Sequence, residues 1–501
     1  MPRSQFVNVR SLGFQYPGSA ASLFKNFDVH FDSGFTGIVG ANGSGKSTLL
    51  QLIGGELTAD FGQITGTEGL IHCAQRTDLP PDRFADFLDG LDGSAYRLRG
   101  RLGIEHDFLE RWQHLSHGER KRAQIATALW QAPAVLTIDE PTNHIDTAAR
   151  SLLLDNLKRF RGVGIIVSHD RALLDELCNR TLWLDDAEPR LYLGGYSKAS
   201  KEKQLDRDAL MHERGNLRRD QKRLEAEVSS RKSKAASANK QRSKAGVSSK
   251  DHDAKSKIDL ARVSGKDGQA GRLLKQMSGR KQQLDEKVDS LHVKKQRDVG
   301  IWLEGATSKR NSLLDVGPLE LELGEYRTLA TPNLIVPPNA RIAITGANGM
   351  GKSTLLAALK GQLNVPDDHL IYMPQEISMV QSQNILVSIK ALPKQQLGQL
   401  MTIVSCLGSD PKNLLSTSLP SPGEVRKLML ALGIARRPWL IVMDEPTNHL
   451  DLPSIEALEQ ALESCPCGLI LVSHDESFLS KLATTYWHLS EKAAGSVLIV
   501  S

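Results

Sequence analysis

The sequence predicts an α/β protein made of two copies of one domain, with an α-helical hairpin linker between them. The stretch GANGSGKST at 40–48 returns as GANGMGKST at 346–354, and further marks repeat in the same order around each copy. Both flanks alternate apolar runs typical of strands with helical stretches, in the manner of βαβ units. Residues 201–300 differ, because they contain no Phe, Trp or Tyr. With 501 residues, the chain is too long for one core, and two large domains fit its length.

The composition is that of a globular protein. It is 40% hydrophobic and 24% charged, and it has no run of about 18 apolar residues that could span a bilayer. The start of the chain does not have the pattern of a signal peptide. The five cysteines are mostly far apart and suit a reducing cytosol better than a disulfide framework, and Cys465 and Cys467 lack zinc spacing. We therefore expect a cytoplasmic protein without membrane contact.

Basic residues are concentrated in the middle of the chain. Residues 201–300 contain 27 Lys and Arg against 15 Asp and Glu, whereas the rest of the chain contains 36 against 43. The stretch 231–250, RKSKAASANKQRSKAGVSSK, has seven Lys or Arg and no acidic residue. Such a segment cannot build a core of its own. It is either a solvated charge run or a surface for a phosphate-rich partner.

Each Gly-rich stretch lies between an apolar run and a helical one. Such a turn points backbone N–H groups at phosphate oxygens, aided by the positive end of the helix. Lys46 and Lys352 would bridge the β- and γ-phosphates of a nucleotide. Ser47 and Ser353 would offer a hydroxyl to Mg²⁺. One such motif occurs by chance, but two with matching partners indicate a duplicated nucleotide site.

Two carboxylates and a histidine follow each Gly-rich turn at matched distances. The runs VLTIDE and LIVMDE describe buried strands that deliver Asp-Glu at their carboxyl ends, where α/β sheets place ligands. The aspartate suits Mg²⁺, and the glutamate would polarise the water that attacks the γ-phosphate. A histidine follows each aspartate by 30 residues, which favours contact with the γ-phosphate over an ordinary strand-end role. The residues are Asp139, Glu140 and His169 in the first copy and Asp444, Glu445 and His474 in the second.

The order of P-loop, glutamine, LSHGE or PSPGE, Asp-Glu and histidine resembles the ATP-binding cassette ATPases. Two cassettes on one chain, no transmembrane segment, EPTNH after each strand and a charged linker are similar to the ABC-F family. The resemblance covers both flanks fully, and the linker by its placement and character. It implies two P-loop ATP-binding-cassette domains that close head to tail on two ATP molecules with Mg²⁺. The protein would then be a monomer whose two cassettes pair with each other.

The resemblance assigns site residues in both cassettes. Those at ATP would be Tyr16, Gly40, Asn42, Gly43, Gly45, Lys46, Ser47, Thr48, Gln75, Ser116, Gly118, Asp139, Gly346, Asn348, Gly349, Gly351, Lys352, Ser353, Thr354, Gln375, Ser421, Gly423 and Asp444. Those at Mg²⁺ would be Ser47, Gln75, Asp139, Ser353, Gln375 and Asp444. The catalytic residues would be Glu140, Glu445, His169 and His474. Because the cassettes close head to tail, each signature serine and glycine would face the P-loop lysine of the other cassette.

The sequence departs from the family pattern at a few positions. The middle glycine of the signature is His117 in the first cassette and Pro422 in the second, although Ser-x-Gly-Glu remains in both. Tyr16 stands where an aromatic side chain stacks on adenine, with core packing as the alternative. Tyr326 is the only aromatic between Trp302 and the second P-loop, and it is placed differently. Adenine recognition in the second cassette therefore stays open.

Heptad spacing in the middle predicts two amphipathic helices paired antiparallel. The apolar positions are Leu210, Leu217 and Leu224 in the first helix and Met277, Leu284 and Leu291 in the second. The basic stretch would end the first helix and begin a tip between the two. Lys and Arg without aromatics suit the phosphates of structured RNA rather than base stacking. The RNA-binding candidates are Lys240, Arg242, Lys244 and Lys250.

We therefore expect a first cassette at 1–195, a basic helical-hairpin linker at 196–305 and a second cassette at 306–501. The ABC-F resemblance implies hydrolysis of ATP to ADP and phosphate. It also implies binding at the tRNA exit site of the ribosome, with the linker directed to the peptidyl-transferase centre. The partners there would be 23S rRNA and the P-site tRNA.

Several functions are compatible with these features. The chain could be a housekeeping translation factor or an antibiotic-resistance ribosomal protection factor. Only 41 residues separate Gln75 from Ser116, which leaves no room for the inserted arm of some members and favours the second. A DNA-structure-binding ATPase is an alternative, because phosphate affinity does not distinguish DNA from RNA. The ATPase component of an exporter is another, although it leaves the basic hairpin unexplained.

Overall fold

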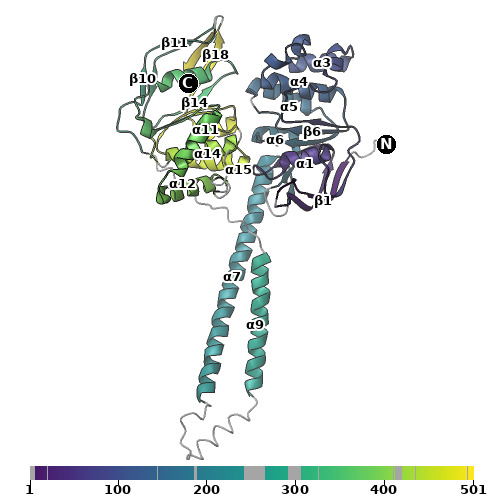
Figure 1. The fold of residues 1–501 in the computed structure, drawn as a ribbon, viewed down its shortest axis with the longest axis vertical. Helices are drawn as coiled ribbons and strands as arrows, with labels where there is room; N and C mark the ends of the chain where they lie inside the picture. The colour runs from purple at the N-terminus through teal and green to yellow at the C-terminus, as the bar shows by residue number, and fades with distance from the viewer. Residues whose placement is uncertain are drawn as a thin grey trace, which may run out of the picture. The chain divides into compact units, whose positions relative to one another are not determined.

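The computed structural model describes most of the chain, and contacts divide it into two units. Unit 1 comprises Met1–Ala199 and Gln296–Ser501, and unit 2 comprises Ser200–Lys295. The residues described are 6–19, 21–143, 145–184, 189–241, 266–290, 306–324, 327–409, 411, 414, 420–434, 436–448, 450–492 and 495–500. Unit 1 contains both cassettes, and unit 2 contains a pair of helices (Figure 1).

The first cassette contains a six-stranded sheet of order β5-β6-β7-β3-β8-β9 and a three-stranded antiparallel sheet of order β2-β1-β4. Its strands are β1 (Phe6–Phe14), β2 (Phe24–Asp32), β3 (Gly34–Val39), β4 (Phe61–Thr65), β5 (Leu70–Cys73), β6 (Val135–Asp139), β7 (Val163–Val167), β8 (Cys178–Trp183) and β9 (Arg190–Leu193). Its helices are α1 (Lys46–Ile53), α2 (Phe84–Asp89), α3 (Gly93–Leu102), η1 (His106–Phe108), η2 (Trp112–His114), α4 (His117–Trp130), α5 (Thr147–Leu157) and α6 (Arg171–Leu177).

The second cassette contains an eight-stranded sheet of order β11-β12-β19-β18-β14-β17-β16-β15 and the pair β10-β13. Its strands are β10 (Leu314–Val316), β11 (Leu319–Glu322), β12 (Thr328–Thr331), β13 (Leu334–Val336), β14 (Arg341–Thr345), β15 (Leu370–Met373), β16 (Leu440–Asp444), β17 (Gly468–Val472), β18 (Thr485–Lys492) and β19 (Gly495–Val500). Its helices are α10 (Lys352–Lys360), η3 (Asp367–His369), α11 (Met379–Lys390), α12 (Lys394–Cys406), α14 (Pro422–Ile434), α15 (Leu452–Glu463) and α16 (Glu476–Leu482).

The strands that position the site are apolar because they are central strands of parallel sheets. Every residue of β6, β7, β16 and β17 is buried. In the first sheet β6, β7 and β3 are parallel neighbours, and in the second sheet β16, β17 and β14 are parallel neighbours. Their carboxyl ends therefore meet at one edge, which brings the P-loop, the Asp-Glu pair and the histidine of each cassette together. The predicted α/β fold with a duplicated domain and a helical insert is confirmed.

Unit 2 pairs α7 (Tyr196–Gln241) with α9 (Lys266–Ser290) in antiparallel order (Figure 1). Gln221 Nε2 donates to Asp285 Oδ1 (2.5 Å), and Lys281 Nζ lies 2.7 Å from Glu225 Oε1. From the first of these contacts to the second, the residue number rises on α7 and falls on α9, so the two helices run in opposite directions. The predicted apolar positions of both helices lie half-buried along this seam, with Val228 and Val288 buried. Leu291, Arg242, Lys244, Lys250 and the side chain of Lys240 lie outside the described residues.

The sequence did not predict a disulfide that the second cassette contains. Cys465 and Cys467 are bonded to each other in the turn between α15 and β17, where their Cα atoms are 5.5 Å apart. Cys73 and Cys178 are buried thiols, and Cys406 is a half-buried thiol. The bond joins near neighbours and connects no distant parts of the chain. Within the part of the chain that the structure describes, no helix is long and apolar enough to cross a membrane.

Replacing Val228 by Asp should open the helix pair of unit 2. The change places a carboxylate in the apolar seam and should cost about 2–3 kcal/mol. We expect limited proteolysis within residues 200–295 to become about tenfold faster or more. Ala226→Asp is the matched control, because Ala226 lies two residues away on the exposed side of α7. Equal cleavage rates for the two variants would contradict the role of the seam.

Candidate functional site

Each P-loop is a turn whose backbone requires glycine. Gly40, Gly43 and Gly45 have φ angles of 152°, 79° and 95°. In the second loop, Gly346, Gly349 and Gly351 have φ angles of 142°, 78° and 93°. A Cβ added at Gly45 would also lie 2.8 Å from the ring of Phe24. The two loops thus share one backbone conformation, and each leads into a helix, α1 or α10, whose N-terminus favours an anion.

The P-loop lysines are held in the same way in both cassettes. Lys46 Nζ donates to the carbonyl oxygens of Gly40 (2.8 Å) and Ala41 (3.0 Å). Lys352 Nζ donates to the two corresponding carbonyl oxygens of its own loop at 2.8 and 3.0 Å. Both lysines are buried at the start of their helices. The loop therefore fixes each ammonium group beside the helix N-terminus, where it can bind phosphate oxygens.

Glu140 and Glu445 adopt a backbone conformation that is rare for glutamate. Their φ angles are 46° and 49°. The backbone N–H of Glu140 donates to Val167 of β7 (2.9 Å), and that of Glu445 donates to Val472 of β17 (2.8 Å). Such a conformation costs about 1–3 kcal/mol, and it persists only where the surroundings impose it. The adjacent strand imposes it here, at the same position in both cassettes.

Each of these glutamates faces a histidine. His169 Nε2 lies 3.1 Å from Glu140 Oε1. His474 Nε2 lies 3.5 Å from Glu445 Oε1 and 3.0 Å from Asn348 Oδ1 in the P-loop. Each glutamate–histidine pair therefore joins the end of the Asp-Glu strand to the loop that follows β7 or β17.

Burial sets the protonation of both pairs. It raises the pKa of Glu140 and of Glu445 to about 8, while the P-loop lysine of each cassette opposes the shift. Burial and the same lysine lower the pKa of His169 to about 3 and that of His474 to about 4. The histidines are therefore neutral near pH 7 and have one hydrogen-bond acceptor and one donor nitrogen. With a pKa of about 8 the carboxyl group is largely protonated at pH 7, and its ionised fraction, which grows as the pH rises, can take a proton from water.

The oxygen atoms expected at Mg²⁺ fit that ion. In the second cassette Ser353 Oγ lies 3.4 Å from Gln375 Oε1 and also bonds Asp444. In the first, Asp139 is 4% exposed, and its Oδ1 has no hydrogen-bond partner among the described residues. A buried carboxylate oxygen without a partner is costly unless a cation compensates its charge. Hydroxyl, amide and carboxylate oxygens are the hard ligands that Mg²⁺ prefers.

A buried cation, which was not predicted from the sequence, lies behind each Asp-Glu pair. Lys121 on α4 is fully buried, and its Nζ donates to the carbonyl oxygens of Ala74 (2.7 Å) and Asp139 (2.9 Å). Arg426 on α14 donates to the glutamine loop and to the Asp-Glu pair of its own cassette in the same way. Both stand five residues after the signature serine, and this repeat was the available signal. Each cation ties the signature helix to the glutamine loop and to the end of the Asp-Glu strand.

Both signature helices begin with the same cap despite their unusual residues. Ser116 Oγ accepts from the N–H of Glu119 (3.3 Å), and the Glu119 carboxylate accepts from the Ser116 N–H (2.8 Å). Ser421 and Glu424 form the same reciprocal pair. Pro422 is the first residue of α14, where a missing N–H costs little. The departures at positions 117 and 422 therefore leave the local geometry of the signatures intact.

The two cassettes contact each other at their nucleotide sites. The N–H of Asn42, in the first P-loop, donates to Asp451 Oδ2 of the second cassette (2.6 Å). A cavity of about 570 Å³ surrounds the second P-loop. It is lined by Asn348, Lys352 and Glu445 of the second cassette and by Thr142, Asn143 and His169 of the first. Among the residues that the structure describes, Ser116 and Gly118 do not line it, so the pairing of each signature with the opposite P-loop stays a prediction.

The candidate adenine contact lies beside the first P-loop. Tyr16 Oη is 2.9 Å from Thr48 Oγ1, and the tyrosine ring packs edge-on against Phe14. The side chain is 43% exposed, so it is not a core residue. One face of its ring can therefore stack on a base. Tyr326, considered for the second cassette, lies outside the described residues.

A family model described as ABC transporter matches the chain twice, at residues 24–143 and 329–448. Each match begins before a P-loop and ends just after an Asp-Glu strand. Each match therefore includes the P-loop, the glutamine, the signature and the Asp-Glu pair of one cassette, whereas the histidine lies beyond it.

Curated relatives match nearly the whole chain. The ribosome protection protein VmlR of Bacillus subtilis (strain 168) is 28% identical over 484 residues, which cover 92% of this chain and 82% of VmlR. The erythromycin resistance ATP-binding protein MsrA of Staphylococcus epidermidis is 28% identical over 468 residues, which cover 90% of this chain and 91% of MsrA.

Solved structures share the arrangement of two cassettes. An archaeal ribosome recycling factor, in complex with a ribosomal stalk protein, matches with a TM-score of 0.63 and 17% identity, covering 97% of this chain and 89% of that chain. A structure of an RNase-L Inhibitor matches with the same TM-score and identity, covering 98% and 90%. At this identity the likeness establishes the fold alone.

Replacing Glu140 and Glu445 together by Gln should block ATP hydrolysis and leave ATP binding intact. The amide keeps the shape of the side chain but cannot take a proton from water, so turnover should fall about 100-fold or more. Phosphate release reports turnover, and fluorescent ATP reports binding. Unchanged turnover in the double variant would contradict the assignment of both glutamates.

Replacing Lys121 by Met should destabilise the first cassette. The change leaves two buried carbonyl oxygens without a donor, at a cost of about 1–3 kcal/mol each. Urea unfolding should show this loss, and Lys121→Arg should recover part of it. Lys158→Met, at the exposed position that directly follows α5, is the control. Equal unfolding free energies for Lys121→Met and Lys158→Met would show that the buried cation does not hold the site together.

Proposed function

The chain belongs to the ABC-F family, whose members carry two ATP-binding cassettes and no transmembrane segment, and from this premise we propose that it is an ATPase that acts on the ribosome. One observation carries the proposal: a basic helical pair, without aromatic residues from position 201 onward, lies in the sequence between two candidate ATP sites. The names of VmlR and MsrA, a ribosome protection protein and an erythromycin resistance protein, support the version in which this chain protects ribosomes from an antibiotic.

Each cassette would bind ATP through its P-loop. The lysine of the loop would take the β- and γ-phosphates, and the helix N-terminus behind it would favour their negative charge. Bound Mg²⁺ neutralises charge on the phosphates, and the serine, glutamine and aspartate of each site would hold it. In the first cassette, Tyr16 would stack on adenine.

Hydrolysis would then use the glutamate–histidine pair. Glu140 or Glu445 takes a proton from the attacking water, the water oxygen bonds the γ-phosphorus, and the bond to the bridging oxygen breaks to leave ADP and phosphate. The neutral histidine can hydrogen-bond the γ-phosphate without adding charge. The strained glutamate backbone keeps the carboxyl group in place before ATP binds.

Contact between the cassettes would couple the two sites. Asp451 of the second cassette bonds the first P-loop, and Thr142, Asn143, Ile145 and Thr147 of the first cassette line the cavity of the second site. We propose that ATP binding completes this contact by bringing each signature to the opposite P-loop, and that hydrolysis relaxes it. The pairing would be intramolecular, in a monomer in the cytoplasm.

The linker would bind RNA through phosphates. We propose that it enters the tRNA exit site and reaches towards the peptidyl-transferase centre, where 23S rRNA and the P-site tRNA lie. Lys and Arg without aromatics suit such phosphate contacts. A DNA-structure-binding ATPase is the alternative, and the experiment below distinguishes the two because it uses ribosomes and duplex DNA side by side.

Removing basic residues of the linker should weaken ribosome binding and its salt dependence. Each lost phosphate contact lowers the slope of log affinity against log salt by about 0.7–0.9. The variant changes Lys240, Arg242, Lys244 and Lys250 to Gln. Titrations at three salt concentrations should show a flatter slope and about tenfold or more weaker binding at physiological salt.

The control for this variant removes the same number of charges from the cassettes. Lys25, Lys309, Lys390 and Lys394 are exposed, and all four change to Gln. The control should bind ribosomes with nearly the affinity of the wild type. Parallel lines of equal affinity for the wild type and the linker variant would mean that the linker only connects the two cassettes. Tighter binding to duplex DNA than to ribosomes would favour the DNA-structure-binding ATPase.

A further inference from the structure

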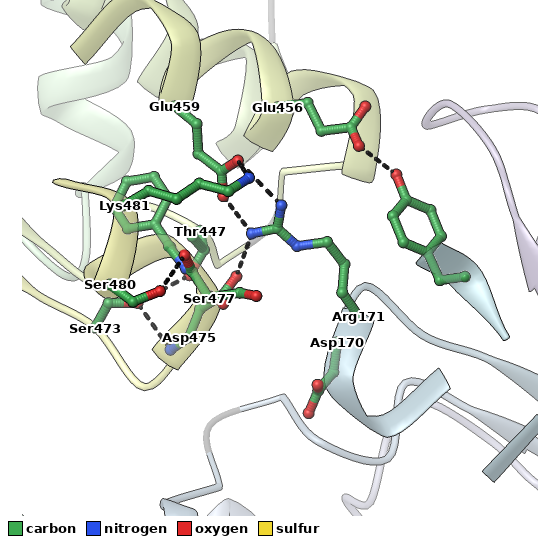
Figure 2. Close-up of polar contacts among 12 residues, drawn as sticks. Asp170, Arg171, Thr447, Glu456, Glu459, Ser473, Asp475, Ser477, Ser480 and Lys481 are labelled. Carbon is green, nitrogen blue, oxygen red and sulfur yellow. Dashed lines mark hydrogen bonds and ion pairs between the residues drawn. The ribbon is translucent and has the colours of Figure 1, made fainter. Parts of the chain in front are cut away.

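A buried arginine of the first cassette bonds two acidic residues of the second. Arg171 begins α6, two residues after His169, and is 7% exposed. Its Nη1 donates to Glu459 Oε2 (3.0 Å), and its Nη2 bonds Glu459 Oε1 and lies 3.3 Å from Asp475 Oδ2. Figure 2 shows the guanidinium group between Glu459 and Asp475. These contacts join the loop after β7 to α15 and to the loop after β17.

Asp475 connects Arg171 to the second nucleotide site. It directly follows His474, whose Nε2 lies 3.0 Å from Asn348 in the P-loop and 3.5 Å from Glu445. Asp475 also caps α16, because its Oδ1 accepts from the N–H of Phe478 (3.0 Å). The carboxylate thus has one oxygen on its own helix and the other on Arg171. A displacement of the Asp475 backbone would also displace the adjacent His474.

The corresponding contact on the other side of the molecule cannot form. From the signature onward, the site residues of the two cassettes are related by a shift of 305 positions, as for Asp139 and Asp444. By this shift Arg171 corresponds to Glu476, and Glu459 corresponds to Leu154. A glutamate opposite a leucine makes no ion pair. Among the residues that the structure describes, the cation at this position therefore extends from the first cassette to the second and has no counterpart in the other direction.

The first cassette supplies a different partner for its own aspartate. Asp170 corresponds to Asp475, and it is paired with Arg150 on α5 of the same cassette, with Nη2 3.1 Å from Oδ1. The residue of the second cassette that corresponds to Arg150 is Ile455. The aspartate that follows the site histidine is thus paired with an arginine in both cassettes. At the first site the arginine belongs to the same cassette, and at the second it belongs to the other cassette.

We propose that Arg171 is a positioning residue for the second ATP site: by holding Asp475 from the opposite cassette, it sets His474 against Asn348 and Glu445 and makes hydrolysis at this site depend on contact between the cassettes. The inference rests on the ATP hydrolysis proposed above and not on the ribosome. The first site, whose aspartate is held by Arg150 of the same cassette, does not depend on an arginine from the other cassette. The two sites are then unequal although their P-loops and Asp-Glu strands match.

A second contact between the cassettes provides a control. Tyr196 Oη donates to Glu456 Oε1 (2.7 Å), one helical turn before Glu459 on α15. Tyr196→Phe removes this bond without touching Asp475. If Arg171 merely joined the cassettes, loss of either contact would have similar effects. If it positions His474, only changes at Arg171 should slow the second site.

The experiment replaces both partners of the buried pair. Arg171→Met alone would leave Glu459 with only Lys481, which is half-exposed. The double variant Arg171→Met with Glu459→Met removes the buried cation together with its more buried carboxylate partner. Asp475 loses the arginine but keeps its bond from the Phe478 N–H, so the variant should fold. Turnover is measured with Glu140→Gln, which leaves the second site active, and with Glu445→Gln, which leaves the first. Arg171→Lys, which keeps the charge, tests rescue.

The double variant should lower kcat at the second site by about tenfold or more, with KM changed less than about twofold, because positioning acts on the transition state. The loss at the first site should be several-fold smaller. Arg171→Lys should recover part of the rate, and Tyr196→Phe should stay within about twofold of its parent. Equal losses at both sites, or no loss at the second, would overturn the proposal.

Amide hydrogen exchange gives a readout that does not depend on turnover. In the double variant, exchange at residues 473–477 should become faster, whereas Tyr196→Phe should leave it unchanged. Unchanged exchange there in the double variant would also overturn the proposal. If the wild type hydrolyses no ATP, the proposed function fails, and the exchange measurement still decides whether Arg171 holds this loop.

Discussion

Paired carboxylates buried at the ends of β6 and β16 are the constraint on which each cassette depends. Asp139, Glu140, Asp444 and Glu445 are each at most 5% exposed. Such charges are costly in the interior unless cations and hydrogen bonds compensate them. Each cassette provides a P-loop lysine on one side and Lys121 or Arg426 on the other, and raised glutamate pKa values relieve the remainder. The signature helix and the glutamine loop are fixed by the same cations.

The two sites share a backbone but not their surroundings. P-loop angles, strained glutamates and signature caps agree closely between the cassettes. The differences lie among the residues that contact the site residues, at Arg150, Arg171 and their partners, where the duplicated sequences have diverged. A buried ion pair contributes little net stability against an apolar pair, but removing one partner is costly. Its asymmetric placement therefore fits a role in coupling the cassettes better than a role in simple adhesion.

Much of the fold and of the site could be predicted, because the responsible residues are close in sequence to the element that positions them. P-loop glycines need positive φ whatever surrounds them, and an apolar run ending in Asp-Glu is a buried parallel strand in any such sheet. Because the domain is duplicated, each motif occurs twice in the same order, which makes a chance match to the motif improbable. Heptad leucines likewise predicted the antiparallel helices of unit 2, since a stripe of apolar residues needs a partner.

The two α/β cassettes, the candidate residues of their nucleotide sites and the basic helical pair between them could be predicted from the sequence, since they follow from local spacing and charge. Contacts between residues far apart in sequence could not be predicted, because they arise from the packing of the folded chain. Lys121 and Arg171 look like ordinary helical cations in the sequence, and burial against a carbonyl or a carboxylate gives them their roles. The contact of Arg171 with Glu459 spans 288 positions. No local pattern encodes such a pair, because it forms only when two folded cassettes are packed against each other.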